Sequence, residues 1–316
     1  MSVSGQTVIE AVNLTKKYNG FTAVDRLNLE VRQGEVFGFL GPNGAGKTTT
    51  ILMLLGLTEP TSGMARVLGY NATREPLRVK SVAGYLPESL GLYEDMTAKQ
   101  NLHYIAQLNN LTKAEAIRRI SELLALVGLP EVADRRVATF SKGMKQRLGI
   151  ACVLIKEPKV VFLDEPTSGL DPDGARFMSE LIVKMSQERG MTVILSSHLL
   201  HQVQRICHRV GIMSKGRLVA EGSVEELGRK MTSSGGQFTV EVETTGDQQR
   251  LNDALWQLKG VTKIEPDGNR LLITCTTDLR PQIAKVVLDS SSSLLRLEMR
   301  GPAPLEEIYM KYFREE

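Results

Sequence analysis

The segment Gly41-Pro42-Asn43-Gly44-Ala45-Gly46-Lys47-Thr48 constrains this chain more than any other part of its sequence. The apolar run 36–40 before it predicts a buried strand, and residues 49–55 after it have a pattern typical of a helix. A glycine-rich turn at a helix N-terminus presents backbone N–H groups to an anion. Lys47 can reach the β- and γ-phosphate oxygens, and the Thr48 hydroxyl can ligate Mg²⁺. The segment therefore predicts binding of a nucleoside triphosphate.

A pair of carboxylates follows a second apolar run. Residues 160–163 are all apolar and are followed by Asp164 and Glu165, which argues against a pair that simply lies on the surface. A strand that ends in this way delivers both carboxylates to the phosphate site. We expect Asp164 to hold Mg²⁺ through water and Glu165 to orient or polarise the attacking water, while Lys47 offsets charge on the γ-phosphoryl group.

The composition limits the classes of protein that remain. With 316 residues, 42% of them hydrophobic, the chain can form one large domain and a smaller one. Its 39 basic and 36 acidic residues are spread along the chain, so its charge does not indicate nucleic-acid binding. Cys152, Cys207 and Cys275 show neither C-x-x-C nor Cys/His ligand spacing, and we expect reduced thiols in a cytoplasmic protein.

The sequence shows neither a signal peptide nor a run of 18 apolar residues. We therefore expect a protein that is not secreted and that has no transmembrane segment. If its work concerns a membrane, another polypeptide must supply the spans.

Residues 1–230 are predicted to form an α/β nucleotide-binding domain. Short apolar runs alternate there with longer periodic stretches, a pattern that favours a mostly parallel sheet. The part from about 97 to 156 shows helical spacing of apolar residues without a strand and predicts an inserted helical subdomain. Ser223 and Glu226 form a predicted capping box that opens a short helix.

A smaller domain is predicted for residues 237–316. The small and polar segment 231–236 is the expected linker. After it come a strand from 238, a helix at 248–258, strands at 261–265 and 270–275, a helix at 280–288 and a strand at 294–299. The order βαββαβ predicts a small α+β, ferredoxin-like accessory domain, and residues 304–313 are expected to add a terminal helix.

A third motif lies between the two elements of the phosphate site. Residues 140–147 read Phe-Ser-Lys-Gly-Met-Lys-Gln-Arg, a Ser-x-Gly turn that leads into a helix. The hydroxyl of Ser141 and the amide of Gly143 at a helix N-terminus form a second anion site. Flanked by Walker A at 41–48 and Walker B at 160–165, this segment resembles the signature loop of ABC-type ATPases. The resemblance covers residues 8–230.

Further motifs follow in the order of that family. Ser168-Gly169-Leu170-Asp171 resembles the D-loop, and Ser197-His198 resembles the switch histidine that contacts the γ-phosphate. Tyr18 resembles the aromatic residue that stacks on adenine. Taken alone, His198 would be read as a structural or surface histidine and Tyr18 as a core tyrosine. The resemblance implies catalytic roles for Lys47, Glu165 and His198, and a Mg²⁺ site at Thr48, Glu88 and Asp164. It implies nucleotide contacts from Tyr18, Gly41, Pro42, Asn43, Gly44, Ala45, Gly46, Lys47, Thr48, Thr49, Ser141, Gly143 and Asp171.

One position departs from the pattern of the family. Residues 84–88 read Gly-Tyr-Leu-Pro-Glu, whereas the family usually has Gln in the last place. A carboxylate at Glu88 can still contact the metal or its water, but it adds negative charge beside Asp164 and Glu165. Metal preference or basal turnover is therefore expected to differ from that of a Gln enzyme.

The resemblance also implies partners. In this family two nucleotide domains sandwich two ATP molecules, and this chain carries one set of motifs, so we expect a homodimer or a heterodimer with a similar ATPase. ATP would close the pair and hydrolysis would open it. A permease subunit would place the chain at the cytoplasmic face of the membrane. Residues 90–96 would contact this permease, with Leu92 and Tyr93 as the candidate contact residues.

Within the family, three segments resemble the ABC-2 type exporter group: residues 84–88, the signature loop and residues 304–309. The ending 308–313 resembles the branch that serves maturation of the copper sites of nitrous oxide reductase. An importer ATPase with a ligand-sensing tail remains an alternative, because a βαββαβ domain also occurs in importers such as those for methionine. A soluble ABC protein acting on ribosomes or DNA is a second alternative, although this chain lacks a second nucleotide domain, a long coiled coil and a basic patch.

Overall fold

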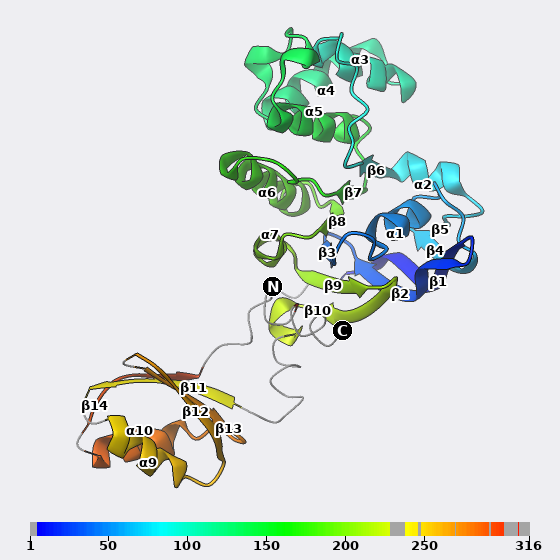
Figure 1. Cartoon of the computed structure of the whole chain (residues 1–316). Coiled ribbons are helices and arrows are strands. Elements are labelled where there is room, and N and C mark those ends of the chain that lie inside the picture. The colour runs from blue at the N-terminus through cyan, green and yellow to red at the C-terminus, as the bar shows by residue number, and fades with distance from the viewer. Residues whose placement is uncertain are drawn as a thin grey trace. The chain divides into compact units, whose positions relative to one another are not determined.

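A computed structural model describes residues 5–227, 238–245, 248–268, 270–290, 292–299 and 309. The chain divides into two compact units, Met1–Glu221 and Gly222–Glu316 (Figure 1). Among the described residues, no helix is both long and apolar enough to span a bilayer. The predicted linker 231–236 lies outside the described residues, as does the predicted terminal helix 304–313 except for Tyr309.

A six-stranded sheet forms the centre of the first unit, with the order β10-β9-β3-β8-β7-β6. Its β3, β6, β7, β8 and β9 pair in parallel, which confirms the predicted sheet. All residues of β3, β7 and β8 are buried, as expected for a parallel sheet covered on both faces. The strands are β3 Val36–Leu40, β6 Ala83–Leu86, β7 Val160–Asp164, β8 Thr192–Ser197, β9 Arg209–Ser214 and β10 Arg217–Gly222.

Helices connect these strands. Between β6 and β7 the chain forms three helices and two 3₁₀ turns, and Figure 1 shows the three helices packed together apart from the sheet. Thr97 and Thr112 begin the first two helices with complete capping boxes, so local sequence sets both starts. The elements are α1 Lys47–Leu54, α2 Pro76–Val82, α3 Ala98–Leu108, α4 Lys113–Leu126, η1 Pro130–Val132, η2 Val137–Thr139, α5 Lys142–Leu154, α6 Pro172–Gln187 and α7 Leu200–Ile206.

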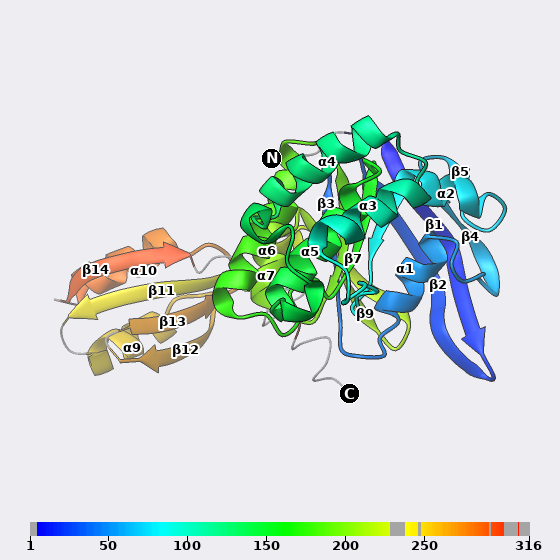
Figure 2. The ribbon, with the colours of Figure 1, turned by 90° about the horizontal axis from the view of Figure 1, so that it is seen from above.

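A second sheet in this unit was not predicted. It is antiparallel, with the order β2-β1-β4-β5, and consists of β1 Thr7–Tyr18, β2 Phe21–Arg32, β4 Ser62–Val67 and β5 Tyr70–Asn71. Figure 2 shows β1 and β2 as long strands that run side by side. Asn19 and Gly20 join them with positive φ angles of 41° and 87°, as a tight hairpin requires. The Asn-Gly pair was the sequence signal for this sheet.

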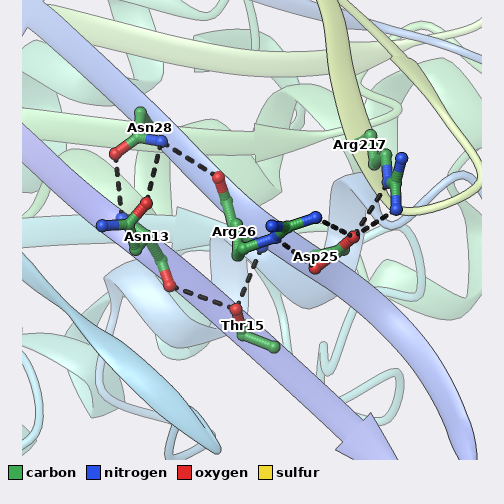
Figure 3. A network of polar contacts seen from close by, with 6 residues as sticks. All are labelled: Asn13, Thr15, Asp25, Arg26, Asn28 and Arg217. Atoms are coloured by element: carbon green, nitrogen blue, oxygen red, sulfur yellow. Dashed lines mark hydrogen bonds and ion pairs between the residues drawn. The ribbon is translucent and has the colours of Figure 1, made fainter.

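Both long strands contain an irregularity at the same level (Figure 3). Asn13 and Arg26 have positive φ angles of 47° and 46°, and the ladder between the strands shifts register there. Side chains replace the missing ladder bonds: the Asn13 N–H donates to Asn28 Oδ1 at 2.9 Å, and the Arg26 N–H donates to Thr15 Oγ1 at 3.0 Å. The network therefore satisfies backbone groups that the bulges leave unpaired.

The same network connects β2 to the phosphate loop. The Asp25 carboxylate accepts bonds from Arg217 Nε at 2.8 Å and contacts its Nη2 at 2.7 Å (Figure 3). The Asp25 N–H donates to the Gly216 carbonyl at 2.8 Å, and the Gly216 N–H donates to the Ala45 carbonyl at 3.1 Å. These bonds hold strand β2, the β9–β10 turn and the phosphate loop in a fixed arrangement.

In its described part, the second unit contains a four-stranded antiparallel sheet with helices α9 and α10 on one face (Figure 1). Its elements follow the predicted order: β11 Phe238–Thr245, α9 Gln248–Trp256, β12 Val261–Asp267, β13 Arg270–Cys275, α10 Arg280–Asp289 and β14 Ser293–Met299. The strand order is β12-β13-β11-β14. The core combines strand residues with helix residues, namely Val240, Val242, Leu271, Ile273, Leu251, Leu255, Ile283 and Val287. Ser223 and Glu226 form the predicted capping box, with bonds of 3.1 and 2.9 Å.

Candidate active site

The phosphate loop connects β3 to α1, as predicted. Gly46 is the N-cap of α1 and has a φ of 100°, and a Cβ at this position would lie 2.5 Å from the Ala23 carbonyl oxygen. Only glycine fits both the backbone angle and the space. Pro42, Asn43 and Gly44 are exposed, so the loop faces solvent where an anion can enter.

Lys47 lies inside this loop with only 6% of its surface exposed. Its ammonium donates to the carbonyls of Gly41 at 2.7 Å and Pro42 at 3.2 Å, and lies 3.7 Å from Glu165 Oε1. Burial lowers the pKa of Lys47, and the negative charges of Glu165, Asp164 and Glu88 oppose that effect. The predicted lysine and carboxylates therefore belong to one electrostatic cluster, although Glu88 itself is exposed.

Asp164 and Glu165 end β7 at the same edge of the sheet. Both are nearly buried, with exposures of 3% and 8%. Glu165 has a positive φ of 48°, a conformation uncommon outside glycine and a form of backbone strain that clusters at functional sites. Its N–H lies 3.1 Å from Ser196 Oγ and 3.2 Å from the Ser196 carbonyl oxygen, and these bonds hold the strained turn.

His198 follows β8 and reaches the same carboxylate. Its Nδ1 lies 2.8 Å from Glu165 Oε2, and 46% of its side chain is exposed. Glu165 Oε1, in contrast, is buried and has no hydrogen-bond partner. One oxygen of this carboxylate is oriented by a histidine, and the other lies near a lysine ammonium without a hydrogen bond, so the group is suited to accept a proton from water.

The residues present fit Mg²⁺. The Thr48 hydroxyl is exposed beside Lys47, and Asp164 and Glu165 supply oxygen atoms, the ligand type that Mg²⁺ prefers. In the described part of the chain, no group of three His, Cys, Asp or Glu side chains is arranged to hold a metal. Mg²⁺ is usually bound by one or two carboxylates together with water and substrate phosphates.

The signature residues line a pocket of their own. Ser141 caps α5 by accepting from the Met144 N–H at 3.2 Å, and Asp171 caps α6 by accepting from the Gly174 N–H at 2.9 Å. Together with Gly143 and Gly169 they line a pocket of about 430 Å³. No residue of the phosphate loop lines this pocket, so Ser141, Gly143 and Asp171 are brought together but apart from Lys47.

Tyr18 lies at the hairpin end of β1 and is 45% exposed. The Lys16 ammonium lies 4.8 Å from the centre of its ring. The alternative that Tyr18 is a core residue is therefore wrong.

A cavity of about 260 Å³ lies between β6 and the helical subdomain. Tyr85, Leu90, Leu92 and Tyr93 are among its lining residues. Tyr93 is 47% exposed, and its backbone N–H and carbonyl both bond to the Asn101 side chain at 2.9 Å. The predicted segment 90–96 thus presents aromatic and aliphatic side chains on a groove.

Comparisons with known proteins agree with this geometry. Residues 24–168 match the model of the family described as "ABC transporter". The bacitracin transport ATP-binding protein BcrA of Bacillus licheniformis is 42% identical over 224 residues, which cover 71% of this chain and 72% of that protein. The linearmycin resistance ATP-binding protein LnrL of Bacillus subtilis (strain 168) is 34% identical over 307 residues, 96% of this chain and 97% of that protein. The chain belongs to the ATP-binding proteins of ABC transporters.

A solved structure of the ATP-binding subunit of an ABC transporter has a TM-score of 0.65 and 33% identity, over 71% of this chain and 93% of that chain. The predicted P-loop ABC ATPase fold and the predicted ATPase activity are therefore confirmed. This ABC ATPase binds ATP or ADP and hydrolyses ATP in a reaction coupled to transport.

Three side chains of this ABC ATPase escaped the sequence interpretation. The Ser196 hydroxyl bonds to the Asp164 carboxylate and accepts the backbone N–H of Glu165. The Tyr85 hydroxyl lies close to Asp164, and Gln202 accepts a hydrogen bond from Thr167, two residues after Glu165. Ser196 and Tyr85 lie within apolar strand patterns, and Gln202 lies on α7. The Ser-Ser pair before His198 was the only local signal.

Proposed function

We propose that this chain is the ATP-hydrolysing subunit of an ABC-2 type exporter and energises a separate membrane permease. The site carries the catalytic part of the proposal: Glu165, nearly buried, lies between Lys47 and His198, and its Oε1 has no hydrogen bond. The transport part is supported by similarity to LnrL, named for linearmycin resistance, along nearly the whole chain. BcrA, named for bacitracin transport, supports it over the first unit.

In the proposed reaction, ATP is held with its phosphates in the loop of Gly41, Pro42, Asn43, Gly44, Ala45 and Gly46, with Thr49 beside them. The Lys47 ammonium turns from the carbonyls of the loop to the β- and γ-phosphate oxygens. Glu165 Oε1 accepts the proton of the water whose oxygen attacks the γ-phosphorus, and the bond from phosphorus to the bridging oxygen of ADP breaks. His198 Nδ1 keeps the carboxylate turned, and its Nε2 is left to face the γ-phosphate.

Mg²⁺ would be held by Thr48 and Asp164, with Glu88 contacting the metal or its water. When bound, it offsets the charge that develops on the γ-phosphoryl group. The carboxylate at Glu88 adds a negative charge to a cluster that already contains two, which is our reason to expect an altered metal preference.

We propose that the chain acts as a dimer, because its signature residues and its phosphate loop lie at separate places on one chain. Ser141, Gly143 and Asp171 line a pocket that excludes the phosphate loop of the same chain. In a pair of ATPases, these residues of one copy would face the ATP bound by the other, and Tyr18 would stack on adenine from the exposed end of β1. The second copy is this chain or a similar ATPase.

The groove beside β6 is the proposed contact with the permease. A cytoplasmic segment of a membrane protein would insert next to Leu92 and Tyr93, which places the chain at the cytoplasmic face of the membrane. Lys145 on α5 contacts Glu94 at 2.5 Å, which ties this rim to the helix that begins at Ser141. Occupancy of the groove can therefore act on the signature residues.

We propose residues 1–230 as the nucleotide-binding domain, with its helical subdomain at about 97–156, and 231–236 as the linker. Residues 237–316 would form a ferredoxin-like accessory domain, supported by its antiparallel strand order. Dimer support or regulation is its proposed role. LnrL matches this part of the chain as well, so the extra domain does not favour an importer. The nitrous oxide reductase branch rests on residues 308–313, of which only Tyr309 is described.

The test uses Glu165→Gln, which keeps ATP binding but removes the group that accepts the proton. Membranes carrying the tagged variant are extracted in mild detergent with ATP and Mg²⁺, and co-purifying proteins are identified by mass spectrometry. We expect a multi-spanning protein without a solute-binding protein. Lys47→Ala is the matched control. It should not form the ATP-bound closed dimer, and should therefore recover less of the multi-spanning protein.

Two results would contradict the proposal. Recovery of a solute-binding protein with the permease would indicate an importer. Recovery of ribosomes, nucleic acid or soluble proteins alone would remove the transport assignment and leave only the ATPase mechanism.

A further inference from the structure

The carboxylate of Asp164 lies between hydroxyl groups from the strands on both sides of β7. On one side, β8 pairs with β7 so that Ser196 lies opposite Asp164. On the other side, β6 pairs with β7 so that Tyr85 lies opposite Phe162, two residues before Asp164. Strand pairing, rather than local sequence, brings the three side chains together.

Ser196 contacts both Asp164 and Glu165. It is fully buried, and its Oγ bonds to Asp164 Oδ1 and accepts the N–H of Glu165 at 3.1 Å. The amide can only donate and the carboxylate can only accept, so the hydroxyl hydrogen is directed to Asp164. One hydroxyl thereby orients Asp164 and supports the left-handed backbone of Glu165, whose φ is 48°.

Tyr85 acts from the opposite strand. Its hydroxyl lies close to Asp164, and burial, followed by the Asp164 charge, raises the pKa of Tyr85 to about 12. A phenol hydroxyl can donate its hydrogen to a carboxylate. Tyr85 also lines the groove of about 260 Å³ beside β6 and lies three residues before Glu88.

We propose that Ser196 and Tyr85 are positioning residues that aim the Asp164 carboxylate at a divalent cation bound with ATP. The inference rests on the proposed function of Asp164 as a metal contact. Asp164 is only 3% exposed, so its carboxylate cannot turn without losing these donors. Partners of this kind fix the orientation of a metal-binding group, and their removal typically weakens metal binding about 10- to 100-fold.

The test compares Ser196→Ala and Tyr85→Phe, each of which removes one hydroxyl. The readout is equilibrium binding of a fluorescent, non-hydrolysable ATP analogue, measured once with Mg²⁺ and once with EDTA. The ratio of the two affinities measures the contribution of the metal. We expect the ratio to fall about 10- to 100-fold in each variant, while the affinity in EDTA stays as in the wild type. The Mg²⁺ concentration that gives half-maximal ATPase activity should rise correspondingly.

The matched control is Ser186→Ala on α6. That hydroxyl is also buried, but it donates to the Gly34 carbonyl at 2.8 Å, away from the carboxylates. The control should keep the wild-type ratio. If Ser196→Ala does not fold, Tyr85→Phe alone decides the test, because it removes a single oxygen from a half-buried ring.

Two kinds of failure are distinguishable. A wild-type chain that does not bind the nucleotide in either buffer would refute the proposed function itself. A wild-type chain with a clear metal effect, together with variants that keep its ratio and lose only thermal stability, would overturn the positioning role alone.

Discussion

The ion pair between Arg209 and Glu35 offers a quantitative test of the packing in the first unit. Glu35 precedes β3 and is 1% exposed, and Arg209 Nη1 lies 3.0 and 3.3 Å from its two carboxylate oxygens. The same guanidinium bonds to Glu221 and lies 5.7 Å from the centre of the Phe37 ring. Replacing Arg209 by Met keeps most of the side-chain volume and removes the positive charge.

The structure sets the expected magnitude. In Arg209→Met, the buried Glu35 retains one donor, the Arg32 N–H at 2.8 Å. Removing one partner of a buried ion pair typically costs 3–5 kcal/mol, and the remaining bond places this case near the lower end, at about 3 kcal/mol. Glu35→Gln removes the buried charge as well as the pair and should cost about 1 kcal/mol. In the double variant no buried charge is left unpaired, so its loss should be about 2 kcal/mol.

Hydrogen exchange of the β3 and β9 amides measures the free energy of opening of the first unit. It is measured in the wild type, the two single variants and the double variant. Fluorescence of Trp256, the single tryptophan of the chain, follows the second unit separately. Glu35 and the phosphate loop lie at opposite ends of β3, so nucleotide affinity at 25 °C should be unchanged. A loss below about 1 kcal/mol in Arg209→Met, or strictly additive losses in the double variant, would refute the reasoning.

Three further outcomes are expected. Gly46→Ala should abolish nucleotide binding, measured by fluorescence titration, because the added Cβ would lie 2.5 Å from a carbonyl oxygen of β2. The control Gly69→Ala has a similar φ of 82° but open space around the added Cβ, so it should keep nucleotide binding. Gln202→Leu should lower kcat about tenfold at unchanged nucleotide affinity, because Thr167 loses its acceptor; an unchanged kcat would contradict this role. Burial raises the pKa of Cys152 from 9.0 to about 12. Its stability contribution is therefore complete below about pH 9 and lost as pH rises towards 12, and alkylation should accelerate about tenfold per pH unit between these limits; fast alkylation at pH 8 would contradict the burial.

Several features of the site could be predicted because they are encoded locally. The phosphate loop needs a strand, a glycine-rich turn and a helix in one continuous segment, and the sequence shows all three. The carboxylates Asp164 and Glu165 were recognisable since an apolar run of strand length precedes them. The βαββαβ order of the second unit followed in the same way from alternating short strands and amphipathic helices.

The first unit also contained features that the sequence interpretation did not anticipate. The antiparallel sheet of β1, β2, β4 and β5 was missed, although Asn19-Gly20 marks its hairpin, because the alternating pattern was interpreted as part of one parallel sheet. The paired bulges at Asn13 and Arg26 have no pattern of their own. They depend on side chains that meet only after the two strands pair.

The sequence by itself determined which groups can hold phosphate and metal, because a loop and its helix are adjacent along the chain. Only the tertiary structure decided how those groups are aimed. Ser196 is 32 residues from Asp164 in sequence, and Tyr85 precedes it on yet another strand. Their hydroxyls reach one carboxylate because parallel strands from distant parts of the chain pair in a particular register. Register is a property of the folded sheet, and no single segment specifies it.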